Sequence, residues 1–213
     1  SKNISKTNRG RELNKTIKTV SFMMIATMLS KVAGLLRDVF IAAKFGTESI
    51  EATAYSYASS LPVQLFDFTL GAAVLATFIP IFNGYLESGD KKRALEFSNN
   101  FINITVLIST VISVLCMLLS KYIGVLIAPD LDAQTQLLLQ KLIVIVLPTT
   151  IFTTLAYAFV GILQSLGEFN VPAIISLVSN VVIILYLLLF DSVYGLCIAM
   201  LVGWGLQFVV QIP

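Results

Sequence analysis

The chain has 213 residues, of which 57% are hydrophobic and only 12% are charged, and its mean hydropathy is +0.89. A water-soluble domain carries far more charge on its surface, so the composition excludes that class of protein. At about 20 apolar residues for each bilayer crossing, the length allows roughly six transmembrane helices with short loops. The sequence therefore predicts an all-α integral membrane protein.

The counts of charged and metal-binding residues exclude several functions. Fourteen basic and twelve acidic residues give a net charge of +2, which is too small to attract nucleic acid. There is no histidine, and Cys116 and Cys197 each lie in an apolar run. We therefore expect no metal site and no disulfide framework. Because no nucleophile and base pair or phosphate-binding loop is visible, we expect neither an enzyme nor a cofactor, but we leave a coupling ion open.

The chain divides into a short tail and six apolar segments. Residues 1–15 are polar and basic, and we expect them to form a cytoplasmic tail. The predicted helices are residues 16–45, 52–85, 97–119, 135–164, 172–190 and 193–211. The first two are longer than a simple span requires, so we expect them to tilt, bend or project from the membrane. Together, residues 16–213 are predicted to form one six-helix bundle.

Basic residues are shared unequally between the two ends of this bundle. Residues 1–18 contain six lysines and arginines and residues 91–93 contain three more, whereas the opposite ends carry only Lys44 and Lys121. Basic residues near membrane spans remain in the cytoplasm. With six crossings, both termini are therefore predicted to lie inside.

Five ionisable residues fall within the apolar segments: Lys31, Arg37, Asp38, Asp67 and Lys141. Each costs about 2.5 to 3.5 kcal/mol at the centre of a membrane helix, so each needs a partner, a wet cavity or a route to the interface. Lys141 lies near its helix end, where it can extend to the interface. Asp38 can neutralise Arg37 or Lys31. Asp67 lies far from both interfaces, and it can bind a cation, titrate or pair with a basic residue of the first helix.

Two kinds of polar group suggest specific roles. The planar guanidinium of Arg37 can grip a phosphate with two parallel hydrogen bonds, so a wet cleft around it would suit a phosphorylated ligand. Uncharged polar residues also occur at membrane depth, at Gln164, Asn180 and Gln207. We expect these amides to form hydrogen bonds between helices.

Several stretches closely resemble the MurJ/MviN family of lipid II flippases. They are residues 30–38 (SKVAGLLRD), 42–46 (AAKFG), Pro62 with 76–82 (ATFIPIF), 161–173 (GILQSLGEFNVPA) with Asn180, and 206–213 (LQFVVQIP). The fourth stretch alone would also fit the wider multidrug/oligosaccharidyl-lipid/polysaccharide exporter superfamily. The resemblance covers about residues 16–213.

This resemblance implies one lobe of a two-lobe transporter, with a C-terminal lobe absent from this chain. The family moves an undecaprenyl-pyrophosphate-linked peptidoglycan precursor across the bacterial cytoplasmic membrane by alternating access. By position, Arg37 matches an arginine assigned to substrate recognition, and Lys31 stands where the family usually has another arginine. Both are expected to hold the pyrophosphate near the inner face. Asp38 or Asp67 would reset the site through a charge pair or a coupled ion.

The chain also departs from the family pattern in its second helix. An acidic residue, alanine and an aromatic residue are usual where this chain has 53–55 (TAY), and an arginine pair is usual where it has Phe66 and Asp67. The second change reverses a charge. Two alternatives therefore stay open: a cation-coupled drug exporter of the same superfamily with Asp67 as its ion site, and a non-transporting membrane scaffold.

Overall fold

The computed structural model describes the backbone of residues 2–212 and the side chains of residues 16–74 and 76–212. Its helices are α1 (Lys2–Phe45), α2 (Ile50–Phe66), η1 (Asp67–Gly71), η2 (Val74–Phe78), α3 (Ile79–Glu87), α4 (Lys91–Leu118), α5 (Ser120–Ile127), α6 (Ala133–Val146), α7 (Thr149–Ser165), α8 (Asn170–Leu189) and α9 (Val193–Val210). The described part of the chain contains no strand, which confirms the all-α class. The basic side chains of the tail, residues 1–15, lie outside the described side chains.

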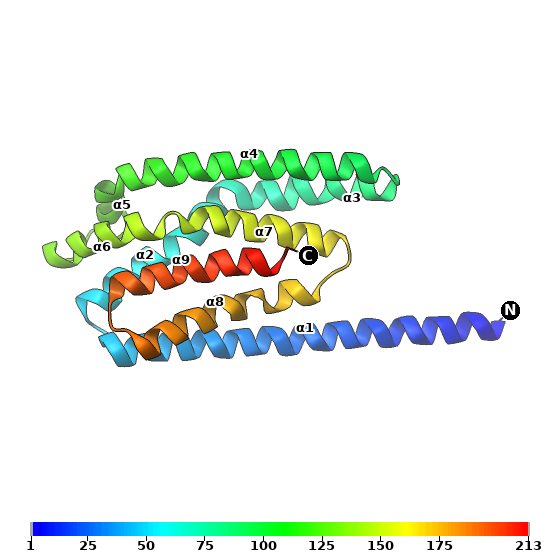
Figure 1. The fold of residues 1–213 in the computed structure, drawn as a ribbon, viewed down its shortest axis with the longest axis horizontal. Coiled ribbons are helices and arrows are strands. Elements are labelled where there is room, and N and C mark those ends of the chain that lie inside the picture. The colour runs from blue at the N-terminus through cyan, green and yellow to red at the C-terminus, as the bar shows by residue number, and fades with distance from the viewer. Residues whose placement is uncertain (1, 213) are drawn as a thin grey trace.

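The long helices run roughly along the same direction, and the turns between them lie at the two ends of the molecule (Figure 1). The α1–α2 and α8–α9 turns lie at one end, which we call the α1–α2 end. The α3–α4 and α7–α8 turns lie at the other, which we call the α7–α8 end, and the start of α1 projects beyond it. Helix α1 packs mainly on α8, α8 packs on α9, and α2 packs on α6.

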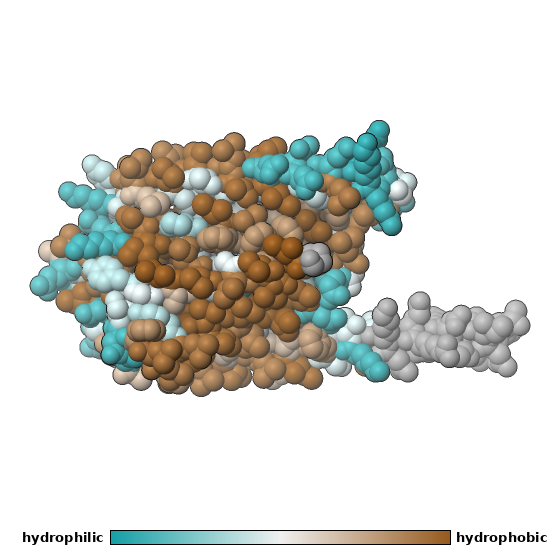
Figure 2. Space-filling model, viewed as in Figure 1, coloured by the Kyte–Doolittle hydropathy of each residue, from teal (hydrophilic) through white to brown (hydrophobic). Residues whose placement is uncertain are grey.

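Six membrane spans account for most of the described chain. Five helical stretches are long and apolar enough to cross a bilayer: Thr16–Phe45, Ile50–Glu87, Lys91–Leu118, Asn170–Leu189 and Val193–Val210. The sixth is the pair α6 and α7, whose axes differ by 46°. On the face shown in Figure 2, hydrophobic residues cover most of the middle, and hydrophilic residues gather toward the two ends. The predicted six-helix membrane bundle is therefore confirmed.

Two of the spans are broken, and their side chains explain one break. The α6–α7 bend lies at Pro148, whose ring has no N–H to continue the helical ladder. The Ser113 hydroxyl on α4 donates to the carbonyl oxygen of Leu147 at 2.8 Å, so it satisfies an acceptor at the bend. The second span is interrupted by the π-helical segments η1 and η2. By contrast, α1 runs unbroken, and α5 occupies part of the stretch expected to connect the third and fourth spans.

The main hydrophobic core buries large side chains, whereas α1 buries small ones. The main core is built by α2, α6, α8 and α9 around large residues, among which Leu139, Leu142 and Ile143 are fully buried. Helix α1 instead buries small residues, including Ala26 and Ala33, which allow its backbone to approach α8 closely. This close approach brings Arg37 of α1 within hydrogen-bonding distance of Asn180 of α8.

Candidate ligand-binding cavity

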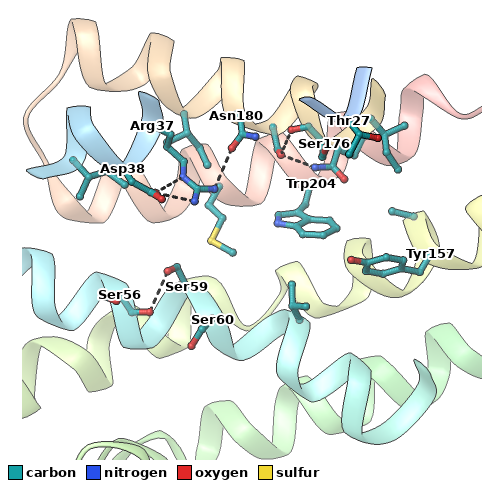
Figure 3. A pocket seen from close by; sticks show the side chains of 18 of the residues that line it. Thr27, Arg37, Asp38, Ser56, Ser59, Ser60, Tyr157, Ser176, Asn180 and Trp204 are labelled. Carbon is teal, nitrogen blue, oxygen red and sulfur yellow. Dashed lines mark hydrogen bonds and ion pairs between the residues drawn. The ribbon is translucent and has the colours of Figure 1, made fainter. Parts of the chain in front are cut away.

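A cavity of about 970 Å³ lies between α1 and α8 on one side and α2 and α7 on the other, with α9 contributing to its lining. It extends from Thr47 at the α1–α2 turn to Gln164 and Phe169 at the α7–α8 turn. The cavity therefore runs the length of the bundle. Figure 3 shows its two walls, with Arg37, Asp38 and Asn180 facing the serines of α2.

Arg37 is the only basic residue among the described residues that line this cavity. Its Nε and Nη2 atoms donate to Asp38 Oδ1 at 2.9 and 2.8 Å, and its Nη1 atom donates to Asn180 Oδ1 at 3.1 Å (Figure 3). The side chain of Arg37 is 34% exposed. Its guanidinium is thus held in place by two neighbours and is still accessible to a ligand. Of the two basic partners that the sequence allowed for Asp38, the structure selects Arg37.

Asn180 holds α1 and α8 together beside this arginine. The residue is 6% exposed, and its Nδ2 atom donates to the carbonyl oxygen of Ser30 on α1 at 3.4 Å. The preceding residue, Ser179, accepts a hydrogen bond from Gln207 of α9 at 2.5 Å. The expected hydrogen bonding between helices is therefore confirmed for Asn180 and Gln207.

The wall opposite Arg37 carries hydroxyl groups that the sequence analysis did not single out. Ser56, Ser59 and Ser60 of α2 line the cavity, with Tyr157 and Trp204 further along it. Ser59 and Ser60 donate to carbonyl oxygens of their own helix, so their oxygens can still accept hydrogen bonds from a ligand. Ser59 and Ser60 follow Ser56 by three and four residues, and this spacing places side chains on one helix face. The sequence could therefore have predicted a polar face on this helix.

The other predicted residues lie elsewhere. Lys31 is exposed and is not among the residues that line the cavity, so its role in substrate binding stays a prediction. Asp67 lines a second cavity of about 320 Å³. No ion pair joins Asp67 to Arg37 or Lys31 among the described side chains, and the coupling role of Asp67 stays a prediction. Lys141 is exposed.

Arg37 does not lie midway along the membrane-spanning part of α1. A helix rises about 1.5 Å per residue, so Arg37 lies about 12 Å from Phe45 and roughly 32 Å from Thr16. Arg37 is therefore closer to the α1–α2 end of the bundle. The basic residues predict that this end faces outward. The expected role of Arg37 in holding a pyrophosphate near the inner face stays a prediction.

Comparison with known proteins identifies the family of this chain. The family model for the lipid II flippase MurJ matches residues 41–213. The chain belongs to the MurJ family.

Its curated relatives include a probable lipid II flippase MurJ from Buchnera aphidicola, which is 28% identical over 92% of this chain and 40% of the relative. The lipid II flippase MurJ of Thermosipho africanus is 31% identical over 86% of this chain and 38% of that protein. Both relatives are described as lipid II flippases, and neither is described as a drug exporter. This MurJ-family chain spans about 40% of the length of the curated relatives that it matches.

Solved structures agree with this assignment. A lipid II flippase MurJ in an inward closed conformation matches with a TM-score of 0.75 and 28% identity, over 89% of this chain and 41% of that one. A superfamily transporter from Pyrococcus furiosus, described as having a binding pocket of reverse polarity, matches with a TM-score of 0.70. Its identity is 14% over 91% of this chain and 43% of that one, so it shows the fold alone.

Proposed function

We propose that this chain is the N-terminal lobe of a lipid II flippase, which moves the undecaprenyl-pyrophosphate-linked peptidoglycan precursor across the bacterial cytoplasmic membrane. Membership of the MurJ family supports the proposal. The observation that carries it within this chain is Arg37, a partly exposed guanidinium in a long cavity at membrane depth. The proposed activity is transport, with no covalent change in the cargo.

Arg37 would bind the pyrophosphate of the cargo. A guanidinium presents paired donors that match two phosphate oxygens, and such charge-assisted hydrogen bonds are strong where water is largely excluded. Asp38 and Asn180 hold this group in orientation. The hydroxyls of Ser56, Ser59 and Ser60 would face the sugars, while the lipid tail stays in the bilayer.

The cavity supports alternating access only in combination with a second lobe. Its lining extends along the molecule from the α7–α8 end to the α1–α2 end, so a headgroup bound in it could be exposed at one end and then at the other. Rocking of a C-terminal lobe against this one would close each end in turn. We place both termini of this chain in the cytoplasm, and we assign resetting of the site to Asp38 or Asp67 with a coupled ion.

Replacement of Arg37 tests the proposal in the full-length protein. Arg37→Ala should abolish lipid II translocation without reducing membrane insertion, because the phosphate loses its two paired donors. Lys31→Ala should reduce translocation less, since Lys31 does not line the cavity. Lys121→Ala removes an exposed charge far from the cavity, and it should be silent. Normal translocation by a well-expressed Arg37→Ala protein would overturn the proposed phosphate anchor.

A further inference from the structure

The second cavity lies between the broken second span and α7. Its lining consists of Phe66, Asp67, Gly71, Ala72, Val74, Ile79, Tyr157, Val160, Gly161 and Gln164. We propose that this cavity binds an organic ammonium group, with the carboxylate of Asp67 as its counter-ion. The group is either an amine on the transported headgroup or a free small amine, and only the first of these sources rests on the proposed function.

The carboxylate of Asp67 lacks a hydrogen-bonding or oppositely charged partner among the described side chains. Among the described side chains it makes no hydrogen bond or ion pair, and it is exposed to the cavity. A negative charge within a membrane span is costly unless a cation or water accompanies it. A cationic ligand would supply that partner.

The cavity walls suit an organic cation better than a divalent metal ion. Calcium takes six to eight oxygen ligands, and magnesium needs a nearly ideal octahedron. Here Asp67, Tyr157 and Gln164 are the only polar side chains among the described lining residues. An alkylammonium needs only one carboxylate, while its carbon atoms contact apolar walls and its charge is attracted to an aromatic ring. Tyr157, which is 37% exposed, supplies such a ring beside the carboxylate.

The backbone leaves room for the ligand beside Asp67. The π-helical segment η1 begins at Asp67 and ends at Gly71, and π-helical turns inside α-helices are frequent at functional sites. A Cβ atom at Gly71 would lie 3.6 Å from Asp67 Oδ1, so the missing side chain keeps the space next to the carboxylate open.

The two cavities adjoin each other. Tyr157, Val160 and Gln164 line both of them. A single elongated headgroup could therefore place a phosphate at Arg37 and an amine at Asp67. This arrangement would use the reversed charge at Asp67, where the family pattern has arginine, to select cargo that carries an ammonium group.

Calorimetric titration of the detergent-solubilised full-length protein with butylammonium chloride tests the site, with butanol as the uncharged control. Asp67→Asn keeps the size of the side chain and should weaken butylammonium binding about tenfold or more, since a charged hydrogen bond is lost. Asp130→Asn removes an exposed carboxylate from the α5–α6 loop and should leave affinity unchanged. Elution of each variant at the wild-type volume shows that it is folded. Unchanged affinity in Asp67→Asn, or no binding by the wild type, would overturn the proposal.

A second measurement identifies the source of the amine. Binding of lipid II with a free side-chain amine is compared with binding of the same lipid after acetylation of that amine. If the cargo carries the ligand, acetylation should weaken wild-type binding, and Asp67→Asn should weaken binding of the free-amine form alone. If a free amine is the ligand, the two lipids should bind equally while butylammonium binding still depends on Asp67. Failure of the Arg37→Ala test would leave the butylammonium result intact, so the two proposals fail separately.

Discussion

At the scale of single residues, the position of Arg37 depends on a neighbour from a distant part of the chain. Asn180 accepts a hydrogen bond from Arg37 and donates one to the Ser30 carbonyl, and both of these partners lie on α1. A buried amide at this point therefore does two things at once: it joins α8 to α1, and it directs the guanidinium toward the cavity. Arg37 supplies the charge, and its hydrogen bonds with Asn180 and Asp38 fix the orientation of the guanidinium.

Replacement of Asn180 should weaken the lobe. We expect Asn180→Ala to lower the free energy of unfolding by about 1 to 3 kcal/mol, because one acceptor of Arg37 and one donor to a buried carbonyl are lost together. Thermal unfolding in detergent micelles measures the change. Asn170→Ala, on the exposed first turn of the same helix, is the matched control and should shift stability by no more than about 0.5 kcal/mol. Equal melting temperatures for the two variants would contradict the role assigned to Asn180.

At the scale of helices, close approach of backbones positions the cavity walls. A Cβ atom at Gly203 on α9 would lie 3.1 Å from the Cα and Cβ atoms of Ser179 on α8. Ser179 also accepts the hydrogen bond from Gln207. The contact between α8 and α9 therefore requires a residue without a side chain at Gly203.

Replacement of two glycines by alanine should have different effects on the melting temperature. Gly203→Ala should lower the melting temperature, because its new methyl group meets the backbone of Ser179, which cannot move without shifting α8. Gly84→Ala, in α3, should raise it or leave it unchanged, since nothing lies within 4 Å and alanine favours a helix by up to about 1 kcal/mol. Thermal unfolding of both proteins checks this, and a loss of stability in Gly84→Ala alone would refute the packing argument.

At the scale of the whole molecule, the basic residues distinguish the two ends of the bundle. The first residues of α4 (91–93) and the start of α1 lie at the α7–α8 end (Figure 1). The α1–α2 end instead carries Lys44, whose charge is neutralised by an ion pair with Asp191 at the α8–α9 turn. The imbalance predicts that the α7–α8 end faces the cytoplasm.

Cysteine labelling of intact cells measures this orientation. Thr47→Cys, at the α1–α2 turn, should react with an impermeant maleimide from outside. Ser88→Cys, at the α3–α4 turn, should react only after the membrane is opened. Cys116, which is partly exposed, is first replaced by alanine, whereas Cys197 is buried. Labelling of Ser88→Cys but not of Thr47→Cys in intact cells would reverse the predicted topology.

The sequence by itself determined the class of the protein and the number of its spans, and it singled out Arg37, which lines the cavity. These conclusions rest on local properties: the length of apolar runs, the cost of a charge in hydrocarbon, and a run of residues around Arg37 that resembles a known family. The sequence did not predict the π-helical segments, the first of which begins at Asp67, because such segments depend on how neighbouring helices pack.

Only the tertiary structure decided which polar groups meet. Asn180 reaches Arg37 across 143 residues of chain, and the serines of α2 face both of them across the cavity. Asp67, although it shares a span with those serines, lies on a separate cavity beside Tyr157. The rotation of each helix about its own axis sets these groupings. That rotation depends on which small and large side chains interlock between helices distant in sequence, and helical periodicity in one segment carries no information about it.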